Sequence, residues 1–232
     1  MRILGIDSSG IVASVAIVEN DELLAEYTVN YKKTHSQTLL PMLDEIVKML
    51  EFDLATIDAI AVAGGPGSFT GLRIGSATAK GLGLALNKEL IHVPTVDALA
   101  YNLVGHEGLV CPIMDARREQ TYTGIYSFVG NELIVEKEQC AVGIGEIIEE
   151  LNQMGKPVTF LGDGVPVFRE YIAEHLQVPY HFAPANNNKQ RAASVAALGL
   201  SLYNKGVKES AAMHRPDYLR LSQAERERLE QQ

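Results

Sequence analysis

The chain has 232 residues, of which 47% are hydrophobic and 21% are charged, a composition typical of a folded protein with a full hydrophobic core. The 29 acidic residues outnumber the 20 basic ones, and the net charge of −9 disfavours tight binding to the phosphate backbone of nucleic acids. The two cysteines, Cys111 and Cys140, are too few for a disulfide framework, and no apolar run is long enough for a signal peptide or a membrane span, so we expect a cytoplasmic protein.

The first half of the chain is predicted to contain three strands, a helix, a strand, a second helix, a short strand and a third helix. Hydrophobic periodicity and turn residues place these elements at residues 2–6, 12–18, 23–29, 36–50, 57–63, 70–87, 90–93 and 95–103. The first strand ends at Asp7. The fourth ends in the glycine loop Gly64-Gly65-Pro66-Gly67, and Ser68 or Thr70 is the expected N-cap of the helix that follows.

The second half repeats this order of elements. Strands are predicted at residues 110–114, 122–128, 133–138 and 158–161, with a helix at 146–152 before the last of them and the loop Gly162-Asp163-Gly164 after it. Such a duplication is typical of the two-lobed α/β fold of actin, hexokinase and Hsp70, the ASKHA fold. We therefore expect an N-terminal lobe of residues 1–105 and a C-terminal lobe of residues 106–232, with the last helix, at 192–204, packing back on the N-terminal lobe.

In that fold, phosphates bind in the cleft between the lobes, close to the turn that follows the first strand of each half. The residues that would form an anion or nucleotide cleft here are Asp7, Gly65, Gly67, Ser68, Asp115 and Arg118. The glycine loop opens a helix, whose amides are able to bind an anion, but it matches neither the Walker sequence nor G-x-G-x-x-G. A tight strand-to-helix connection explains the same glycines, so the nucleotide question stays open at this point.

The sequence gives little support to metal-dependent or nucleophilic chemistry. None of the six histidines stands four residues from another, the spacing that points two imidazoles of a helix at one ion, and no serine lies in G-x-S-x-G. We therefore expect no metal site, no cofactor and no catalytic residue.

The second helix carries a small residue at every fourth position from Gly71 to Gly83. Glycine inside a helix costs about 1 kcal/mol relative to alanine, and close approach by a neighbouring helix is the expected compensation. Together with the apolar stripe of the first helix, this pattern predicts a protein–protein interface made by Leu39, Met42, Leu43, Ile46, Gly71, Arg73, Gly75, Ala79 and Gly83. Packing inside the chain's own lobe is the alternative.

Several longer segments match a known pattern. The most specific runs from Gly64 to Gly75, and the others are Ile3–Ser9, His35–Gln37, Leu40–Met42, Asp115–Tyr122 and Pro216–Arg220. Together these segments resemble the bacterial TsaB (YeaZ) family over essentially the whole chain.

The resemblance implies a partner subunit in the formation of N6-threonylcarbamoyladenosine (t6A) at position 37 of tRNAs that read ANN codons. In that system a related protein, TsaD, carries the metal and transfers the threonylcarbamoyl group, and an ATPase, TsaE, joins the assembly. TsaB-like chains bind TsaD through their first two helices and form homodimers through the same surface in its absence. The histidine pair that binds metal in TsaD is missing here, where the corresponding stretch is His92-Val93-Pro94-Thr95-Val96-Asp97.

We therefore expect a non-catalytic scaffold subunit without membrane contact and without tight nucleic-acid binding of its own. An actin-like ATP-dependent kinase is the alternative suggested by Asp7, the glycine loops and the duplicated fold. A metallopeptidase-like hydrolase is a weaker alternative, because the sequence offers no evident ligand set with which zinc would activate water.

Overall fold

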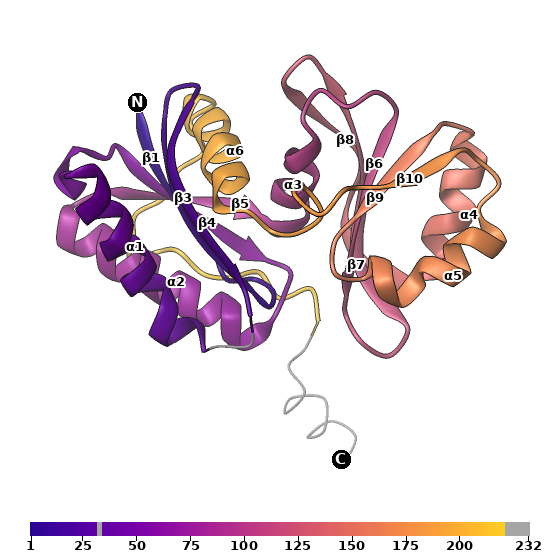
Figure 1. Cartoon of the computed structure of the whole chain (residues 1–232), viewed down its shortest axis with the longest axis horizontal. Helices are drawn as coiled ribbons and strands as arrows, with labels where there is room; N and C mark the ends of the chain where they lie inside the picture. The colour runs from indigo at the N-terminus through magenta and orange to yellow at the C-terminus, as the bar shows by residue number, and fades with distance from the viewer. Residues whose placement is uncertain (32–33, 221–232) are drawn as a thin grey trace, which may run out of the picture.

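The computed structural model describes residues 1–31 and 34–220 and has two lobes, each built on a five-stranded mixed sheet (Figure 1). The N-terminal sheet has the strand order β3 (Glu22–Asn30), β2 (Val12–Glu19), β1 (Arg2–Asp7), β4 (Ala59–Gly65), β5 (Glu89–Pro94). The C-terminal sheet has the order β8 (Glu132–Gly143), β7 (Gln120–Val129), β6 (Leu109–Asp115), β9 (Val158–Leu161), β10 (Tyr180–Phe182).

The two sheets have the same topology. In each, the first three strands form an antiparallel meander, and the two remaining strands pair in parallel beside the first one. The predicted two-lobed, duplicated actin-like fold is therefore confirmed.

Helices cover both faces of the N-terminal sheet. The helices α1 (His35–Leu50) and α2 (Phe69–Leu86) lie side by side on one face, and α6 (Ala192–Asn204) lies on the other (Figure 1). Each face is sealed by its own hydrophobic cluster. A 3-10 turn, Leu54–Thr56, connects α1 to β4. None of the described helices is long and apolar enough to cross a membrane.

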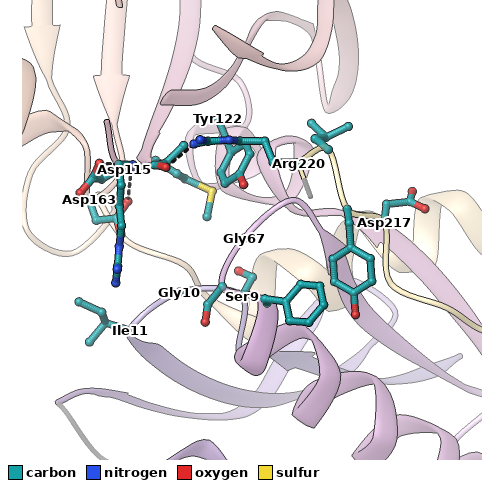
Figure 2. A pocket seen from close by; sticks show the side chains of 16 residues that line it. Ser9, Gly10, Ile11, Gly67, Asp115, Tyr122, Asp163, Asp217 and Arg220 are labelled. Carbon is teal, nitrogen blue, oxygen red and sulfur yellow. Dashed lines mark hydrogen bonds between the residues drawn. The ribbon is translucent and has the colours of Figure 1, made fainter. Parts of the chain in front are cut away.

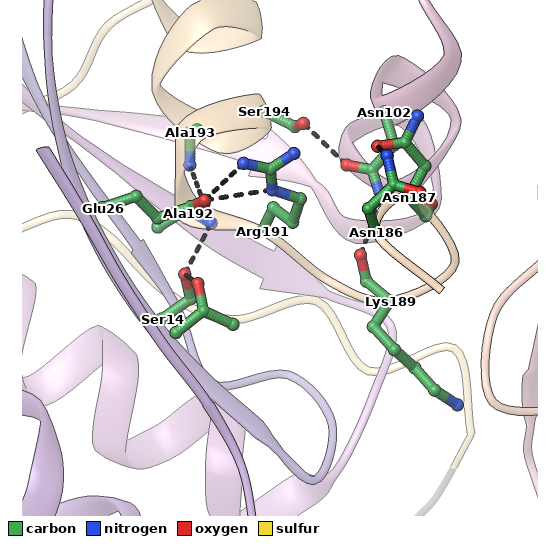
Figure 3. A network of polar contacts seen from close by, with 11 residues as sticks. Ser14, Glu26, Asn102, Asn186, Asn187, Lys189, Arg191, Ala192, Ala193 and Ser194 are labelled. Carbon is green, nitrogen blue, oxygen red and sulfur yellow. Dashed lines mark hydrogen bonds and ion pairs between the residues drawn. The ribbon is translucent and has the colours of Figure 1, made fainter. Parts of the chain in front are cut away.

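Polar contacts fix the N-terminus of α6 on the N-terminal sheet (Figure 3). The carboxylate of Glu26 on β3 accepts hydrogen bonds from the backbone amide of Ala193, at 3.0 Å, and from the guanidinium of Arg191, at 2.6 Å. The hydroxyl of Ser14 on β2 accepts one from the amide of Ala192, at 2.9 Å. These bonds satisfy amides that a helix start leaves free, so α6 is held in the first lobe although it comes late in the chain.

The C-terminal lobe has its helices on the side away from the first lobe. The helices α4 (Ile144–Met154) and α5 (Val165–His175) pack on the second sheet around one hydrophobic cluster. The short helix α3 (Thr95–Ala100) and a 3-10 turn, Tyr101–Leu103, stand between the sheets, and α3 packs against β6 and β7. The lobe boundary proposed at residues 105 and 106 falls between this turn and β6.

Two elements of the second lobe, α5 and β10, were not predicted. Gly162, Gly164 and Pro166 suggest a loop, but Pro166 stands in the first turn of α5, where its missing amide hydrogen is no loss. The strand β10 has only three residues and forms through its parallel pairing with β9. Both depend on neighbours in space that a local pattern does not reveal.

A terminal strap, residues 207–220, runs along the N-terminal lobe and ends at the other lobe. Glu209 exchanges two backbone hydrogen bonds of 2.9 Å with Leu90 of β5, and the amide of Asp217 donates to the carbonyl oxygen of Gly64 at 2.7 Å. Arg220 donates from its guanidinium to the carbonyl oxygen of Ala116 at the end of β6. The strap therefore connects the two lobes along the edge of the molecule.

Candidate functional site

The predicted interface residues lie on α1 and α2, but all of them except Arg73 face the lobe's own interior. The buried ones are Leu39, Met42, Leu43, Ile46, Gly71, Gly75, Ala79 and Gly83. The apolar stripe of each helix is already covered by its own sheet, which favours the alternative of packing inside the lobe. Contact of these eight residues with a partner stays a prediction.

The turn after β1 explains the small-residue stripe of α2. The hydroxyl of Ser8 donates to the carbonyl oxygen of Gly71 at 2.9 Å. A Cβ atom at Gly71 would lie 2.0 Å from the carbonyl oxygen of Ser8, and one at Gly75 would lie 2.4 Å from its hydroxyl oxygen. Side chains at these positions would push the helix off the turn, so the glycines serve internal packing.

The same two helices also carry exposed residues. On α2, Arg73, Ala77, Gly81 and Ala85 follow one another at every fourth position and are all exposed, and Leu84 is 66% exposed. On α1, Leu40 is 52% and Met49 is 83% exposed. We call this surface the outer helix face; its members are Leu40, Met49, Arg73, Ala77, Gly81, Leu84 and Ala85. A Cβ atom at Gly81 would meet nothing within 4 Å, so no internal contact requires this glycine.

A cleft of about 380 Å³ opens between the lobes (Figure 2). Its lining comes from the turn after β1, the start of α2, the end of β6 with the loop that follows it, and the strap. The lining includes Ser9, Gly67, Ser68, Asp115, Arg117, Asp163, Asp217 and Arg220. The ring of Phe69 lies 4.4 Å from the ring of Tyr218 in the strap and 4.0 Å from the guanidinium carbon of Arg73. The cleft and the outer helix face therefore adjoin at the start of α2.

The structure brings three of the six predicted cleft residues to the cleft, namely Gly67, Ser68 and Asp115. Arg118 is exposed outside its lining, where Arg117 takes the place beside Asp115, and Gly65 and Asp7 are buried beneath it. The carboxylate of Asp7 accepts from the amide and the hydroxyl of Ser9, at 2.9 and 2.7 Å, and burial raises the pKa of this carboxyl to about 6. Asp7 is therefore closed off from a ligand in the cleft.

The glycine loop uses its amides internally. The amide of Gly65 donates to the hydroxyl of Thr95 at 3.0 Å, and the amide of Ser68 donates to the carbonyl oxygen of Ser9 at 2.6 Å. The hydroxyl of Ser68 caps α2 by accepting from the amide of Gly71 at 3.3 Å. These bonds favour the tight strand-to-helix connection over a phosphate cradle.

Sequence reasoning missed much of the charge in the cleft. Asp163 accepts from the amide of Asp115 at 3.1 Å, and burial raises the pKa of its carboxyl. Asp217 and Arg220 arrive with the strap. The Gly162-Asp163-Gly164 loop, which matches the position of the first glycine loop, was the available signal for Asp163. With the carboxylates of Asp115, Asp163 and Asp217 against the guanidinium groups of Arg117 and Arg220, the lining disfavours a bare anion.

Among the described side chains, three lie close enough together to bind one metal ion: His92 on β5, and Glu209 and His214 in the strap. One nitrogen or oxygen atom of each lies within 4.8 Å of those of the other two. A search for histidines at helical spacing misses this group because its two histidines are far apart in the chain. None of the three belongs to the cleft lining.

Comparisons with known proteins agree with this architecture. Residues 22–228 match the family model described as TsaD: tRNA N6-adenosine threonylcarbamoyltransferase. The chain is 34% identical, over 234 residues that span all of both proteins, to the tRNA threonylcarbamoyladenosine biosynthesis protein TsaB of Bacillus subtilis (strain 168). The chain belongs to the TsaB (YeaZ) family.

Further relatives support this TsaB assignment. The TsaB protein of Escherichia coli (strain K12) is 34% identical over 155 residues, which are 66% of this chain and 67% of that protein. The solved structure of YeaZ from Pseudomonas aeruginosa superimposes with a TM-score of 0.77 at 23% identity, over 94% of this chain and 99% of that one. The TsaB resemblance carried by the glycine motif and by Pro216–Arg220 is confirmed, and parts of both segments line the cleft.

Proposed function

We propose that this TsaB-family chain serves tRNA threonylcarbamoyladenosine biosynthesis as a non-catalytic partner subunit. The observation that carries the proposal is the outer helix face, where large apolar side chains such as Leu84, Leu40 and Met49 stand exposed on two neighbouring helices. Large apolar side chains exposed on two neighbouring helices favour contact with another protein. The pathway is the one in the printed names of the TsaB relatives.

The proposed partner is a TsaD-like transferase, a protein of the family whose model this chain itself matches. A partner of related fold would present an equivalent pair of helices, and the two pairs would pack as a helical bundle. The small residues Ala77, Gly81 and Ala85 suit this contact, because they allow the helix backbones to approach closely. In the partner's absence a second copy of this chain would occupy the same face, and a TsaE-like ATPase would join the assembly.

The cleft supports the non-catalytic part of the proposal. Its lining contains neither histidine nor cysteine in the described part of the chain. Two of the loop amides that would hold a phosphate, those of Ser68 and Gly65, are already bonded to Ser9 and Thr95. The reaction itself is therefore assigned to the partner.

An ATP-dependent kinase is the second candidate, and the cleft is the observation that favours it. Asp115 and Asp163 both line it, and carboxylates are groups that hold magnesium. The bonded glycine loop weighs against this candidate, so we place it second.

Replacing Leu84 by arginine tests the interface. A charge placed in the centre of a desolvated contact should weaken binding to the purified TsaD-like partner at least about tenfold, which corresponds to roughly 1.4 kcal/mol. Val167→Arg is the matched control, since Val167 is a 58% exposed apolar residue on α5 of the other lobe. Binding is measured by surface plasmon resonance, and circular dichroism confirms that both variants fold. Wild-type affinity in Leu84→Arg would refute the proposed docking surface.

A further inference from the structure

A histidine pair and a carboxylate meet where the strap crosses β5. The rings of His92 and His214 have centroids 5.6 Å apart, and Glu209 lies beside His214. The side chain of His214 has no exposed surface, whereas those of His92 and Glu209 are 23% and 31% exposed. The group therefore consists of one fully buried histidine and two partly exposed side chains.

Two buried nitrogen atoms of this group lack a hydrogen-bond partner. The Nδ1 atom of His214 lies 2.7 Å from the Glu209 carboxylate, which only accepts, so Nδ1 carries the proton in the neutral ring. The Nε2 atom then presents a lone pair that nothing in the described chain contacts. The Nε2 atom of His92 is likewise unbonded, because the Asp217 carboxylate at 3.2 Å is not aligned with it for a hydrogen bond. Buried polar atoms without partners are rare and require an explanation.

We propose that His92, Glu209 and His214 form a binding site for one divalent transition metal ion, Zn²⁺ or an ion of similar chemistry. Two imidazoles and a carboxylate are a common ligand set for zinc. The ion would bond the Nε2 atoms that are otherwise orphaned. To bond the same ion, the Glu209 carboxylate would exchange its contact with the Nδ1 atom of His214 for a bond to the metal.

The geometry permits such a site after a small adjustment. Ligand atoms of a tetrahedral zinc site stand about 3.3 Å apart, given bonds of about 2 Å, and here they lie within 4.8 Å. The partly exposed side chains of His92 and Glu209 would move inward while the buried His214 stays in place. Asp217 is the nearest candidate for a fourth ligand, since its carboxylate is already 3.2 Å from His92. The ammonium of Lys80 is occupied by the carbonyl oxygens of Ala212 and His214, both at 3.2 Å.

The ion would bind the strap to the N-terminal lobe. His92 belongs to the sheet, and the other two ligands belong to the segment that carries Asp217, Tyr218 and Arg220 to the cleft. Metal binding should therefore stabilise the whole strap. This inference does not depend on the proposed function, because it concerns the isolated chain.

The test is a titration of the tag-free, metal-stripped full chain with Zn²⁺, followed by calorimetry, and with Co²⁺, followed by its visible spectrum. We expect one ion per chain, the absorption of tetrahedral Co²⁺, and a melting temperature raised by several degrees with Zn²⁺. His92→Ala should weaken binding more than about 100-fold and abolish the thermal shift. Glu209→Gln keeps an acceptor for His214, so it should fold normally and still bind at least about tenfold more weakly.

His181→Ala is the control, since His181 is an exposed histidine on β10 in the other lobe, and it should bind as the wild type does. Two results would overturn the inference. One is weak binding of several ions without a tetrahedral Co²⁺ spectrum in the wild type. The other is unchanged affinity in both His92→Ala and Glu209→Gln.

Discussion

Gly71 and Gly81 stand on opposite faces of one helix and illustrate what a single residue contributes. Gly71 is buried under the turn after β1, where the carbonyl oxygen of Ser8 occupies the space of a side chain. Gly81 is exposed and has open space around its missing Cβ atom. The same residue type is thus required by packing at one position, whereas at the other no contact within the chain requires it.

Alanine at these two positions should have opposite effects on stability. Gly71→Ala should lower the free energy of unfolding by about 1–3 kcal/mol, because backbone atoms of the turn must shift. Gly81→Ala should raise it by about 0.5–1 kcal/mol, since alanine favours the helix and meets nothing. Urea denaturation followed by circular dichroism measures both. A change of the same sign in the two variants would contradict the packing described here.

At the scale of elements, α3 is the connection between the two sheets. The carboxylate of Asp97 on α3 accepts a hydrogen bond of 2.7 Å from the hydroxyl of Tyr126 on β7. Burial, with a smaller contribution from Glu138, raises the pKa of Asp97 to about 6 despite this bond. Burial, together with the neighbouring Asp97 carboxylate, raises the pKa of Tyr126, so its hydroxyl stays protonated and donates.

This shift makes stability fall as the pH rises. The carboxyl has a pKa of about 6 in the folded chain and about 3.9 in the unfolded chain, so it binds its proton more tightly when folded. The free energy of unfolding therefore falls as the pH rises from about 4 to 6. Asp97→Asn still accepts from Tyr126 but does not ionise. Its free energy of unfolding should be close to that of the wild type near pH 4 and exceed it by on the order of 3 kcal/mol at pH 7.5.

Denaturation curves recorded from pH 4 to 7.5 measure this difference. The exposed Asp21→Asn serves as the control and should retain the wild-type profile. Parallel profiles for Asp97→Asn and the wild type would show that Asp97 does not titrate as described.

The elements that the sequence predicted well are those with strong periodicity, such as α1, α2 and the strands of both meanders. Their faces were assigned less well. The stripe from Gly71 to Gly83 indicates that something approaches α2 closely, but the pattern does not say whether a partner or the turn at Ser8 fills that role. The outer face with Ala77 and Gly81 has the same spacing and was overlooked, because small exposed residues give no hydrophobic signal.

At the scale of the whole molecule, the sites depend on segments that are distant in the chain. The lobes, the cleft and three of its residues, Gly67, Ser68 and Asp115, follow from the duplicated order of elements and its glycine loops. The strap does not, because an irregular segment has no periodicity, and its contacts with Leu90 and Gly64 are long-range. The charges at Asp217 and Arg220, and the histidine pair at β5, were therefore beyond sequence reasoning.

The central claim, that the chain supports a reaction it does not perform, is tested most directly by reconstitution. Unmodified tRNA is incubated with the TsaD-like transferase, the TsaE-like ATPase and the threonylcarbamoyl donor, with and without this chain, and t6A is measured by mass spectrometry of the digested tRNA. We predict t6A only in the complete mixture, with loss of product for Leu84→Arg and retention for Val167→Arg. Formation of t6A by this chain alone, or equal yield without it, would contradict the account.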